Sequence, residues 1–309
     1  MTKPFRTTEE MVQILESRGL TINEQTAYFL RSENYYSVIN GYKDIFLAGN
    51  THPEKYAPGT TFDELYSVFL FDRALRYFTF QWLMTIESML KTVIAHKSSE
   101  YYQDDPEFYL KLDTFKTDKR TIRLSRKTVE KLQQQHDRKH PSLDHYRRQY
   151  GYIPFWVLVS YVTFGELSHF YAHLRERSLQ QKIVNELNAL LPDNPKKLTV
   201  ERLRAYLRVL SDFRNVCAHN ERFYCHYHSR VSVNGKNLAN VADLLNIISQ
   251  LLLSEDIQHF HRRFVETYST FLKSGAVRPE YMDKIILAMG MPSDMTATSI
   301  FNNQSQGKK

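Results

Sequence analysis

The stretch TFDELYSVFLFDRALRYFTFQWLMTIESMLKTVI, residues 61–94, carries a helical pattern over its whole length. Apolar side chains recur in it every three or four positions, as at Leu65, Phe69 and Leu83. Asp63 and Glu64 stand near its start, where the positive end of a helix dipole favours carboxylates. The pattern predicts either one helix of more than 30 residues or two helices in near-continuity.

Helical periodicity continues on both sides of this stretch. It marks the segments near residues 7–32, 154–167, 178–191, 203–216, 238–253 and 255–273. Only 10 Gly and 10 Pro occur among the 309 residues, too few turn signals for a β-sandwich. Residues 223–233 alternate loosely and end at Asn234-Gly235, which favours one short β-hairpin. We therefore predict an all-α (mainly α) fold, a helical bundle with a short hairpin.

Composition divides the chain into four parts. Residues 1–55 are expected to form an N-terminal helical extension, and residues 56–103 together with 151–275 form the helical core. Residues 104–150 interrupt that core as a basic, Gln-rich insertion or partly mobile arm. Residues 276–309 are expected to form a C-terminal helix and a disordered tail, because residues 292–309 are mostly polar.

The net charge of +7 is concentrated in the basic insertion. Residues 111–150 hold 12 Lys or Arg against 5 Asp or Glu, a balance equal to the charge of the whole chain. Such a segment is typical of a surface that binds a polyanion, although the same charges can simply solvate a helix face. Arg73 and Arg76, which lie outside this segment, could add phosphate contacts, but they are equally well explained as solvated or ion-paired arginines. The candidate phosphate contacts are Arg73, Arg76, Lys119, Arg120, Arg123, Arg126 and Lys127.

The cellular compartment can be predicted from the absence of three features: a disulfide framework, a signal segment and a membrane span. Cys217 and Cys225 form no disulfide framework, which fits a reducing environment. No apolar signal segment opens the chain, and apolar runs such as residues 247–253 are far shorter than the roughly 20 residues of a membrane span. We expect a cytoplasmic protein that does not enter a membrane.

Residues 213–222, FRNVCAHNER, contain the candidate catalytic residues Arg214, Asn215 and His219. A guanidinium suits phosphate oxygens and an imidazole exchanges protons near pH 7, so together they could break a phosphodiester. Asn215 and His219 share a helix face, whereas Arg214 and His219 lie about 140° apart on an ideal helix. Arginine's length, a distorted helix end or a second subunit must then bring them together. Alternatively, both cations merely cap a helix C-terminus.

Further polar residues are expected near this motif. Glu87 and Lys91, four residues apart, could form an ion pair at the site or an ordinary surface pair. Asn220 and Arg222 extend the polar run beyond His219, with Arg222 as a candidate second phosphate clamp.

Two groups of residues invite a metal-site interpretation: Cys217, Cys225, His226 and His228, and His136, His140 and His145. The first has the spacing of no common structural zinc site, and a cysteine on an apolar helix face is usually a small buried side chain. In the second, Pro141 breaks the helix that would align the ligands, so we expect solvated histidines. Glycine-rich phosphate loops and zincin motifs are missing. No metal or other cofactor is predicted.

Several sequence blocks together resemble the Abi-like (AbiD/AbiF) family of bacterial abortive-infection proteins, which carry a HEPN-type ribonuclease core. They are LESRGL at 15–20, FLR at 29–31 with NYY at 34–36, GY at 41–42, FDRALR at 71–76, IESMLK at 86–91, PFW at 154–156, TFGELS at 163–168 and FRNVCAHN at 213–220. The blocks keep their order over residues 10–275. Lys91 stands where that family usually has Arg, and the segment 111–150 has no counterpart in the family pattern.

The resemblance implies a HEPN-like bundle, a homodimer that joins two R-x4-H motifs, and metal-independent RNA cleavage to 2′,3′-cyclic phosphate ends in anti-phage defence. It implies a toxin that an antitoxin, RNA or protein, must restrain. HEPN proteins often set an acidic residue against the motif Arg, which favours Glu87. The alternative function is a non-catalytic RNA-binding or scaffold protein with the same fold.

Overall fold

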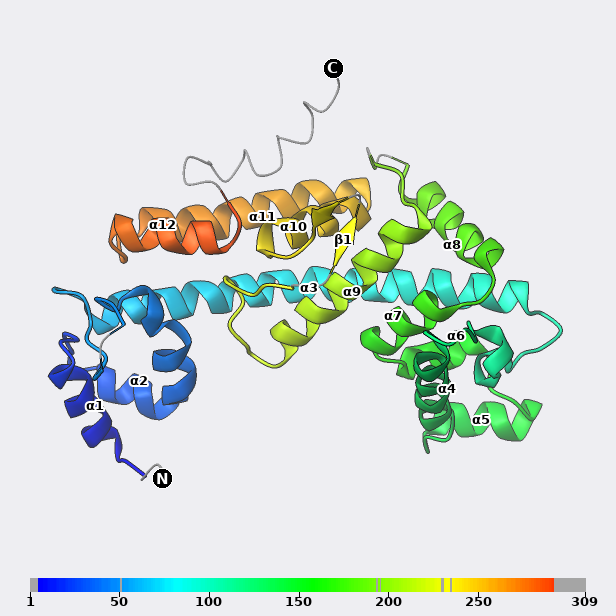
Figure 1. Cartoon of the computed structure of the whole chain (residues 1–309), viewed down its shortest axis with the longest axis horizontal. Coiled ribbons are helices and arrows are strands. Elements are labelled where there is room, and N and C mark those ends of the chain that lie inside the picture. Colours follow the sequence, from blue (N-terminus) through cyan, green and yellow to red (C-terminus); the bar gives the residue numbers. More distant parts are fainter. Residues whose placement is uncertain are drawn as a thin grey trace, which may run out of the picture.

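A single long helix, α3 (Phe62–Tyr101), crosses the whole molecule in this computed structural model (Figure 1). Its start is fixed by a capping box. The Thr61 hydroxyl accepts from the N–H of Glu64 over 3.2 Å, and the Glu64 carboxylate accepts from the N–H of Thr61 over 3.2 Å. The stretch that defined the fold class is therefore one helix rather than two, about 60 Å long at 1.5 Å per residue.

Other helices pack on α3 along its length. α11 (Ser254–Lys273) lies along its first half, α8 (Arg177–Leu190) lies on its second half, and α9 (Val200–Ala218) crosses between them (Figure 1). The remaining helices are α1 (Thr8–Ser17), α2 (Thr26–Ser32), α4 (Ile122–His136), α5 (Pro141–Tyr150), α6 (Phe155–Leu158), α7 (Phe164–His173), α10 (Val241–Leu251) and α12 (Pro279–Ala288). Short π or 3-10 turns occur at Tyr36–Asn40, Lys43–Ile45, Phe108–Leu110, Leu112–Thr114 and Val159–Tyr161.

The structure describes residues 5–50, 52–192, 194, 196–228, 231–233 and 235–291. Within them the chain is helical apart from loops, isolated bridges and one hairpin, which confirms the all-α prediction. In the hairpin, β1 (Ser232–Val233) pairs antiparallel with β2 (Lys236–Asn237). Gly235 has a φ of 78°, as a tight turn requires, whereas Asn234 of the predicted turn lies outside the described residues.

The hydrophobic core follows the inner side of α3. The periodic residues Leu65, Leu75, Leu83 and Ile94 are at most 1% exposed. Phe71 stacks on Phe271 of α11 with ring centroids 3.9 Å apart, and such packing of aromatic rings fastens the two helices along their length. Because this core is continuous, α3 offers a fixed frame to which other segments attach.

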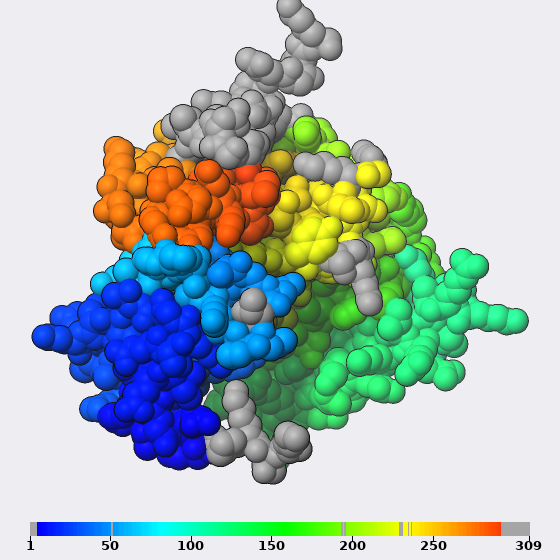
Figure 2. All heavy atoms as spheres, turned by 60° about the vertical axis from the view of Figure 1, so that its left-hand side comes forward, coloured from blue at the N-terminus to red at the C-terminus, as the bar shows by residue number. Residues whose placement is uncertain are grey.

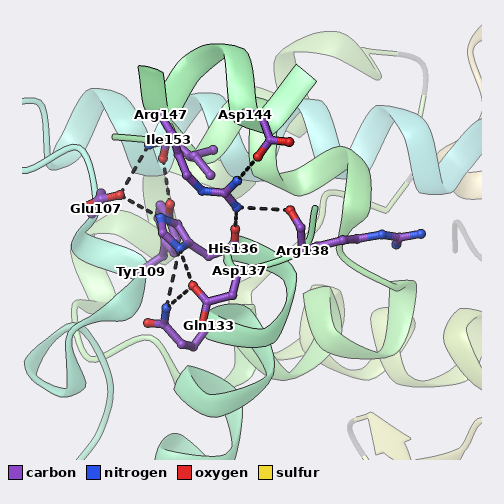
Figure 3. Close-up of polar contacts among 9 residues, drawn as sticks. All are labelled: Glu107, Tyr109, Gln133, His136, Asp137, Arg138, Asp144, Arg147 and Ile153. Atoms are coloured by element: carbon purple, nitrogen blue, oxygen red, sulfur yellow. Dashed lines mark hydrogen bonds and ion pairs between the residues drawn. The ribbon is translucent and has the colours of Figure 1, made fainter. Parts of the chain in front are cut away.

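The basic segment 104–150, expected as an insertion or partly mobile arm, is folded into α4 and α5, and α4 packs on α7. His136 lies between Glu107 and Asp137, with Nε2 and Nδ1 each 3.0 Å from a carboxylate oxygen (Figure 3). His140 caps α5 and contacts the Tyr161 hydroxyl at 2.7 Å. The expectation that these two histidines are solvated was wrong, because each joins neighbouring segments.

Figure 2 shows the N-terminal residues, in blue, and the residues of the basic segment, in teal-green, on opposite sides of the molecule. The predicted C-terminal helix is present as α12, and the predicted disordered tail at 292–309 lies outside the described residues. In the described part of the chain, every helix is too short or too polar to cross a bilayer.

Candidate functional site

The R-x4-H motif straddles the C-terminal end of α9. Arg214 and Asn215 lie in the last turn, the helix ends at Ala218, and His219 is the C-cap residue. The buried stripe of α9 packs against α3 and α7, which fixes the position of this helix end. The motif therefore combines a rigid part with a residue at the point where the chain leaves the helix.

Asn220 turns the chain away from α9. It has a φ of 54°, in the left-handed region. Its N–H donates to the carbonyl of Cys217 over 3.4 Å, and the N–H of Glu221 donates to the carbonyl of Val216 over 3.0 Å. These bonds form a Schellman motif, whose left-handed residue is usually Gly and sometimes Asn. The left-handed conformation therefore explains why an Asn occupies position 220, without any contact to a substrate.

Arg214 faces α3, where a buried carboxylate meets it. Its Nε lies 3.3 Å from Glu87 Oε2, and Lys91 Nζ lies 2.8 Å from Glu87 Oε1. The Glu87 side chain is 4% exposed, so its charge needs both cations, while the Arg214 side chain keeps 26% exposure. The expected Glu87–Lys91 pair is present, and Arg214 is fixed by it with part of its guanidinium still accessible.

His219 and Asn215 lie on a different side of α9 from Arg214. Both are exposed, and within the described residues no hydrogen bond joins the Asn215 side chain to the imidazole. Only the backbone N–H of His219 reaches Asn215, at its carbonyl, over 2.9 Å. Arg214 thus contacts α3 while His219 is exposed at the helix end, and the orienting role of Asn215 stays a prediction.

The segment after the motif is fixed by a second buried carboxylate on α3. Asp72, which is 0% exposed, accepts from the N–H of Phe223 at 3.1 Å and of Tyr224 at 2.6 Å. Arg76 pairs with Asp72 at 2.5 Å and donates to the carbonyl of Glu221 over 3.2 Å. Sequence reasoning missed this role of Asp72 because the backbone groups that it binds, those of Phe223 and Tyr224, lie about 150 residues away in the chain.

Two of the candidate phosphate contacts on α3 already have protein partners. Arg76 is 2% exposed in the Asp72 cluster, which favours a structural role over contact with a phosphate. Arg73 pairs with Glu33 at 2.6 Å and lies over the ring of Phe69. Arg222 donates to the carbonyl of Gly41 over 2.7 Å and keeps a side-chain exposure of 38%.

The basic candidates around α4 form an exposed surface. All are exposed, and among the described residues none of these side chains has a carboxylate partner: Lys119, Arg120, Arg123, Arg126 and Lys127. A groove of about 300 Å³ between α4 and α7 is lined by Lys127, Lys131 and His169 among others. Burial and then the charges of Arg208 and Lys127 lower the pKa of His169. His169 on α7 therefore lies near cations of both α4 and α9, and the groove lining also includes the carboxylate of Glu166.

A second groove runs along α3 beside the Glu87 cluster. It has a volume of about 910 Å³, and its lining includes Met84, Glu87, Lys91, His96 and Trp156. Trp156 is 53% exposed and Met84 43%, so two large apolar residues of the lining are open to solvent. The groove thus places an open apolar surface next to the carboxylate that binds Arg214.

Asp212 of α9 forms a pair with His226, which follows the helix, and this pair was not predicted from the sequence as part of the site. His226 Nε2 lies 2.7 Å from Asp212 Oδ2, and the His226 ring packs edge-on against Phe213 with centroids 4.8 Å apart. Asp212 is seven residues before His219 and so lies on the same helix face. That spacing was the available sequence signal, but the return of residue 226 to α9 depends on the turn at Asn220.

Burial makes Cys217 poorly suited to bind a metal ion. Cys217 is buried, which raises the pKa of its thiol to about 12, and a protonated thiol is a poor ligand. Within the described residues, no group of three or more His, Cys, Asp or Glu side chains could hold a metal ion.

The fold and site define an all-α protein with an Arg–His motif at a helix end. The family model for Abi-like proteins matches residues 28–225. This range covers more than half of the chain and includes both α3 and the motif, so the chain belongs to the Abi-like protein family. No curated protein and no solved structure matches the chain.

Proposed function

We propose that this protein is a metal-independent endoribonuclease of the HEPN type that acts in abortive-infection defence against phage. Membership of the Abi-like family supports the biological role. The observation that carries the chemical role is the environment of the motif: Glu87 fixes a partly exposed Arg214, while His219 is exposed at the adjacent helix end. Fixed cations and an accessible imidazole are what phosphodiester cleavage without a metal requires.

The proposed reaction uses the 2′-OH of the RNA as the nucleophile. A base removes its proton, the 2′-oxygen attacks phosphorus, and the P–O5′ bond breaks as an acid protonates the leaving oxygen. The products are a 2′,3′-cyclic phosphate and a 5′-OH. His219 exchanges a proton, and Arg214 stabilises the charge that accumulates on the phosphate oxygens.

A homodimer would allow Arg214 and His219 to act on the same phosphate although they point in different directions within one chain. Within one chain Arg214 faces α3 and His219 faces outward, so one phosphate is more readily shared by Arg214 of one copy and His219 of another. The apolar groove beside Glu87 supports this arrangement, because it offers surface that a second copy could cover near Arg214.

RNA binding would be supplied by the surface on α4. Unpaired cations on an exposed helix face bind a polyanion by releasing its counterions. The same surface favours the second candidate function, an RNA-binding or scaffold protein without catalysis. As a toxin the enzyme would need restraint, and we propose a cognate antitoxin, either RNA or protein.

The test is cleavage of a mixture of total RNA and tRNA by the purified chain in EDTA. Wild-type protein should cleave and leave cyclic phosphate ends, whereas His219→Ala and Arg214→Ala should be at least 100-fold slower. His259→Ala on α11 is a matched control, because that histidine is exposed and distant from the motif in the sequence. If all variants bind RNA equally and none cleaves it, the scaffold function is supported.

The dimer proposal has its own test. Mixing Arg214→Ala with His219→Ala chains produces heterodimers in which one of two composite sites is intact, so activity should return to about a quarter of wild type after random exchange. No recovery despite exchange of subunits would contradict a site shared between copies.

A further inference from the structure

The Asp212–His226 pair has the construction of an oriented proton-transfer group. Asp212 Oδ2 binds His226 Nε2 at 2.7 Å, and Phe213 packs against the ring, so the imidazole is fixed on two sides. Within the described residues, no hydrogen bond occupies Nδ1 of His226, and the side chain retains 23% exposure. One ring nitrogen is therefore bound by a carboxylate while the other is free to meet a ligand.

Asp212 lies on the side of α9 that carries Asn215 and His219, and away from Arg214. Asp212, Asn215 and His219 follow one another at helical spacing, and Asp212 is about 10 Å from His219 along the axis. The Schellman turn at Asn220 reverses the chain, and the N–H groups of Phe223 and Tyr224 donate to Asp72, which holds the returning segment. The turn and these hydrogen bonds return the chain toward α9, where His226 contacts Asp212 and Phe213.

The contacts around the pair favour the ionised form of the Asp212 carboxylate. The hydrogen bond from His226 lowers the pKa of Asp212, with further contributions from the charges of His228 and Arg208. Asp212 is thus an anion at neutral pH, and a carboxylate bound to Nε2 fixes the orientation of the imidazole, with Nδ1 directed away from Asp212. His219, in contrast, has no carboxylate partner in the described part of the chain.

We propose that His226, positioned by Asp212, is the second proton-transfer group of the ribonuclease site and acts as the general acid. This inference rests on the proposed function and adds the group that cleavage needs besides His219. His219 takes the proton of the 2′-OH, the P–O5′ bond breaks, and Nδ1 of His226 gives its proton to the departing 5′-oxygen. Each turnover then ends with His219 protonated and His226 neutral, and exchange with water restores both.

The experiment compares two RNA oligonucleotides that share one cleaved linkage. In the second, sulfur replaces the bridging 5′-oxygen, and a thiolate leaves without receiving a proton. His226→Gln should slow cleavage of the ordinary linkage by roughly 100-fold or more, but should cleave the sulfur linkage within about tenfold of wild type. His219→Ala should be slow on both substrates, because the 2′-OH still needs a base.

A matched control is His136→Gln, which alters another half-buried histidine bound to carboxylates, at a site far along the chain from the motif (Figure 3). It should cleave both substrates at the wild-type rate. Circular dichroism and thermal melting establish that each variant is folded. If folded His226→Gln is slow on both substrates, or equals wild type on the ordinary linkage, the acid role is overturned while the proposed function stands. A wild-type chain that cleaves neither substrate overturns the proposed function, and this assignment with it.

Discussion

At the scale of single residues, Glu87 is the best example of a side chain whose position defines its role. It is 4% exposed and contacts both Arg214 and Lys91. A carboxylate buried to this degree is stable because cations surround it, and removing it leaves two cations facing each other. The Glu87–Lys91 pair could be predicted because it is local, whereas the contact with Arg214 spans 127 residues and depended on the family resemblance.

We predict that Glu87→Gln destabilises the protein by about 1–3 kcal/mol, because two cations lose their counter-charge. RNA cleavage should fall as well, since Arg214 is no longer fixed. Urea unfolding and cleavage assays measure both effects. Glu100→Gln is the control on the same helix, where a pair with Lys97 at 3.1 Å is exposed and should be worth less than about 1 kcal/mol. Equal stability losses in the two variants would contradict the role given to Glu87.

Asn220 gives a second prediction at this scale. Asn220→Gly should leave stability within about 1 kcal/mol of wild type, whereas Asn220→Val should lose about 1–2 kcal/mol, because a β-branched residue is strained at positive φ. If Asn220 serves only the turn, the Gly variant should also cleave RNA normally. A glycine variant that is stable but inactive would show that the amide takes part in the reaction.

At the scale of elements, α4 shows where sequence patterns are weak. Its buried residues are Ser125, Thr128 and Leu132, so two of the three are polar. The Ser125 hydroxyl donates to the carbonyl of Lys116 over 2.7 Å, and Thr128 bonds His173 over 3.1 Å. A helix that packs through such small polar residues has no broad apolar stripe. For this reason the sequence of this segment was interpreted as an insertion or a partly mobile arm. Its basic outer face could be predicted from the sequence, because a local excess of Lys and Arg is apparent without any helical periodicity.

Neutralising that face tests its function. Replacing Arg123, Arg126, Lys127 and Lys131 by Gln should weaken RNA binding, and the slope of log K against log salt should become shallower by about 3 for single-stranded RNA. Fold stability should change little, because the four side chains are exposed. Fluorescence anisotropy between 50 and 300 mM salt measures the slope. Arg177→Gln with Arg263→Gln, two exposed ion-paired cations, is the control. An unchanged slope would remove α4 from the RNA interface.

At the scale of the whole molecule, the dependence of stability on pH follows from buried imidazoles. Burial lowers the pKa of His173 to about 4, with smaller effects from nearby cations, and burial alone lowers that of His261 to about 4. Both rings are therefore neutral in the folded protein at pH values where they are charged in the unfolded chain.

The sign of the effect is fixed by these shifts. Since the unfolded histidine binds its proton near pH 6.5 and the folded one near 4, the unfolded state carries more protons between those values. Stability should be constant above about pH 6.5 and should fall as pH drops to 4, with the melting temperature decreasing by roughly 2–4 °C per kcal/mol. His173→Gln keeps a partner for Thr128 and should flatten the curve. A variant curve parallel to that of wild type would contradict this account.

The fold class and the presence of a helical segment over residues 61–94 could be predicted because they follow from periodicity, whereas the choice between one helix and two, and the end at Tyr101, could not. The candidate site could be predicted only in part. Arg214 and His219 are adjacent in sequence, but Asp72 and His226 reach the site through tertiary contacts that leave no local pattern. Both residues reach the motif only because the chain turns back after Asn220.

Two of the three buried carboxylates on α3, Asp72 and Glu87, restrict how the length of this helix can change. Asp72 and Glu87 are 15 residues apart, about 22 Å along the axis, and each holds a different part of the motif segment. Inserting one residue between them would rotate Glu87 by about 100° relative to Asp72, and inserting seven would restore the direction but displace it by about 10 Å. Substitutions in this interval can be absorbed by neighbouring side chains, but a change in length cannot. Alignments of related chains should therefore be free of gaps between these two positions.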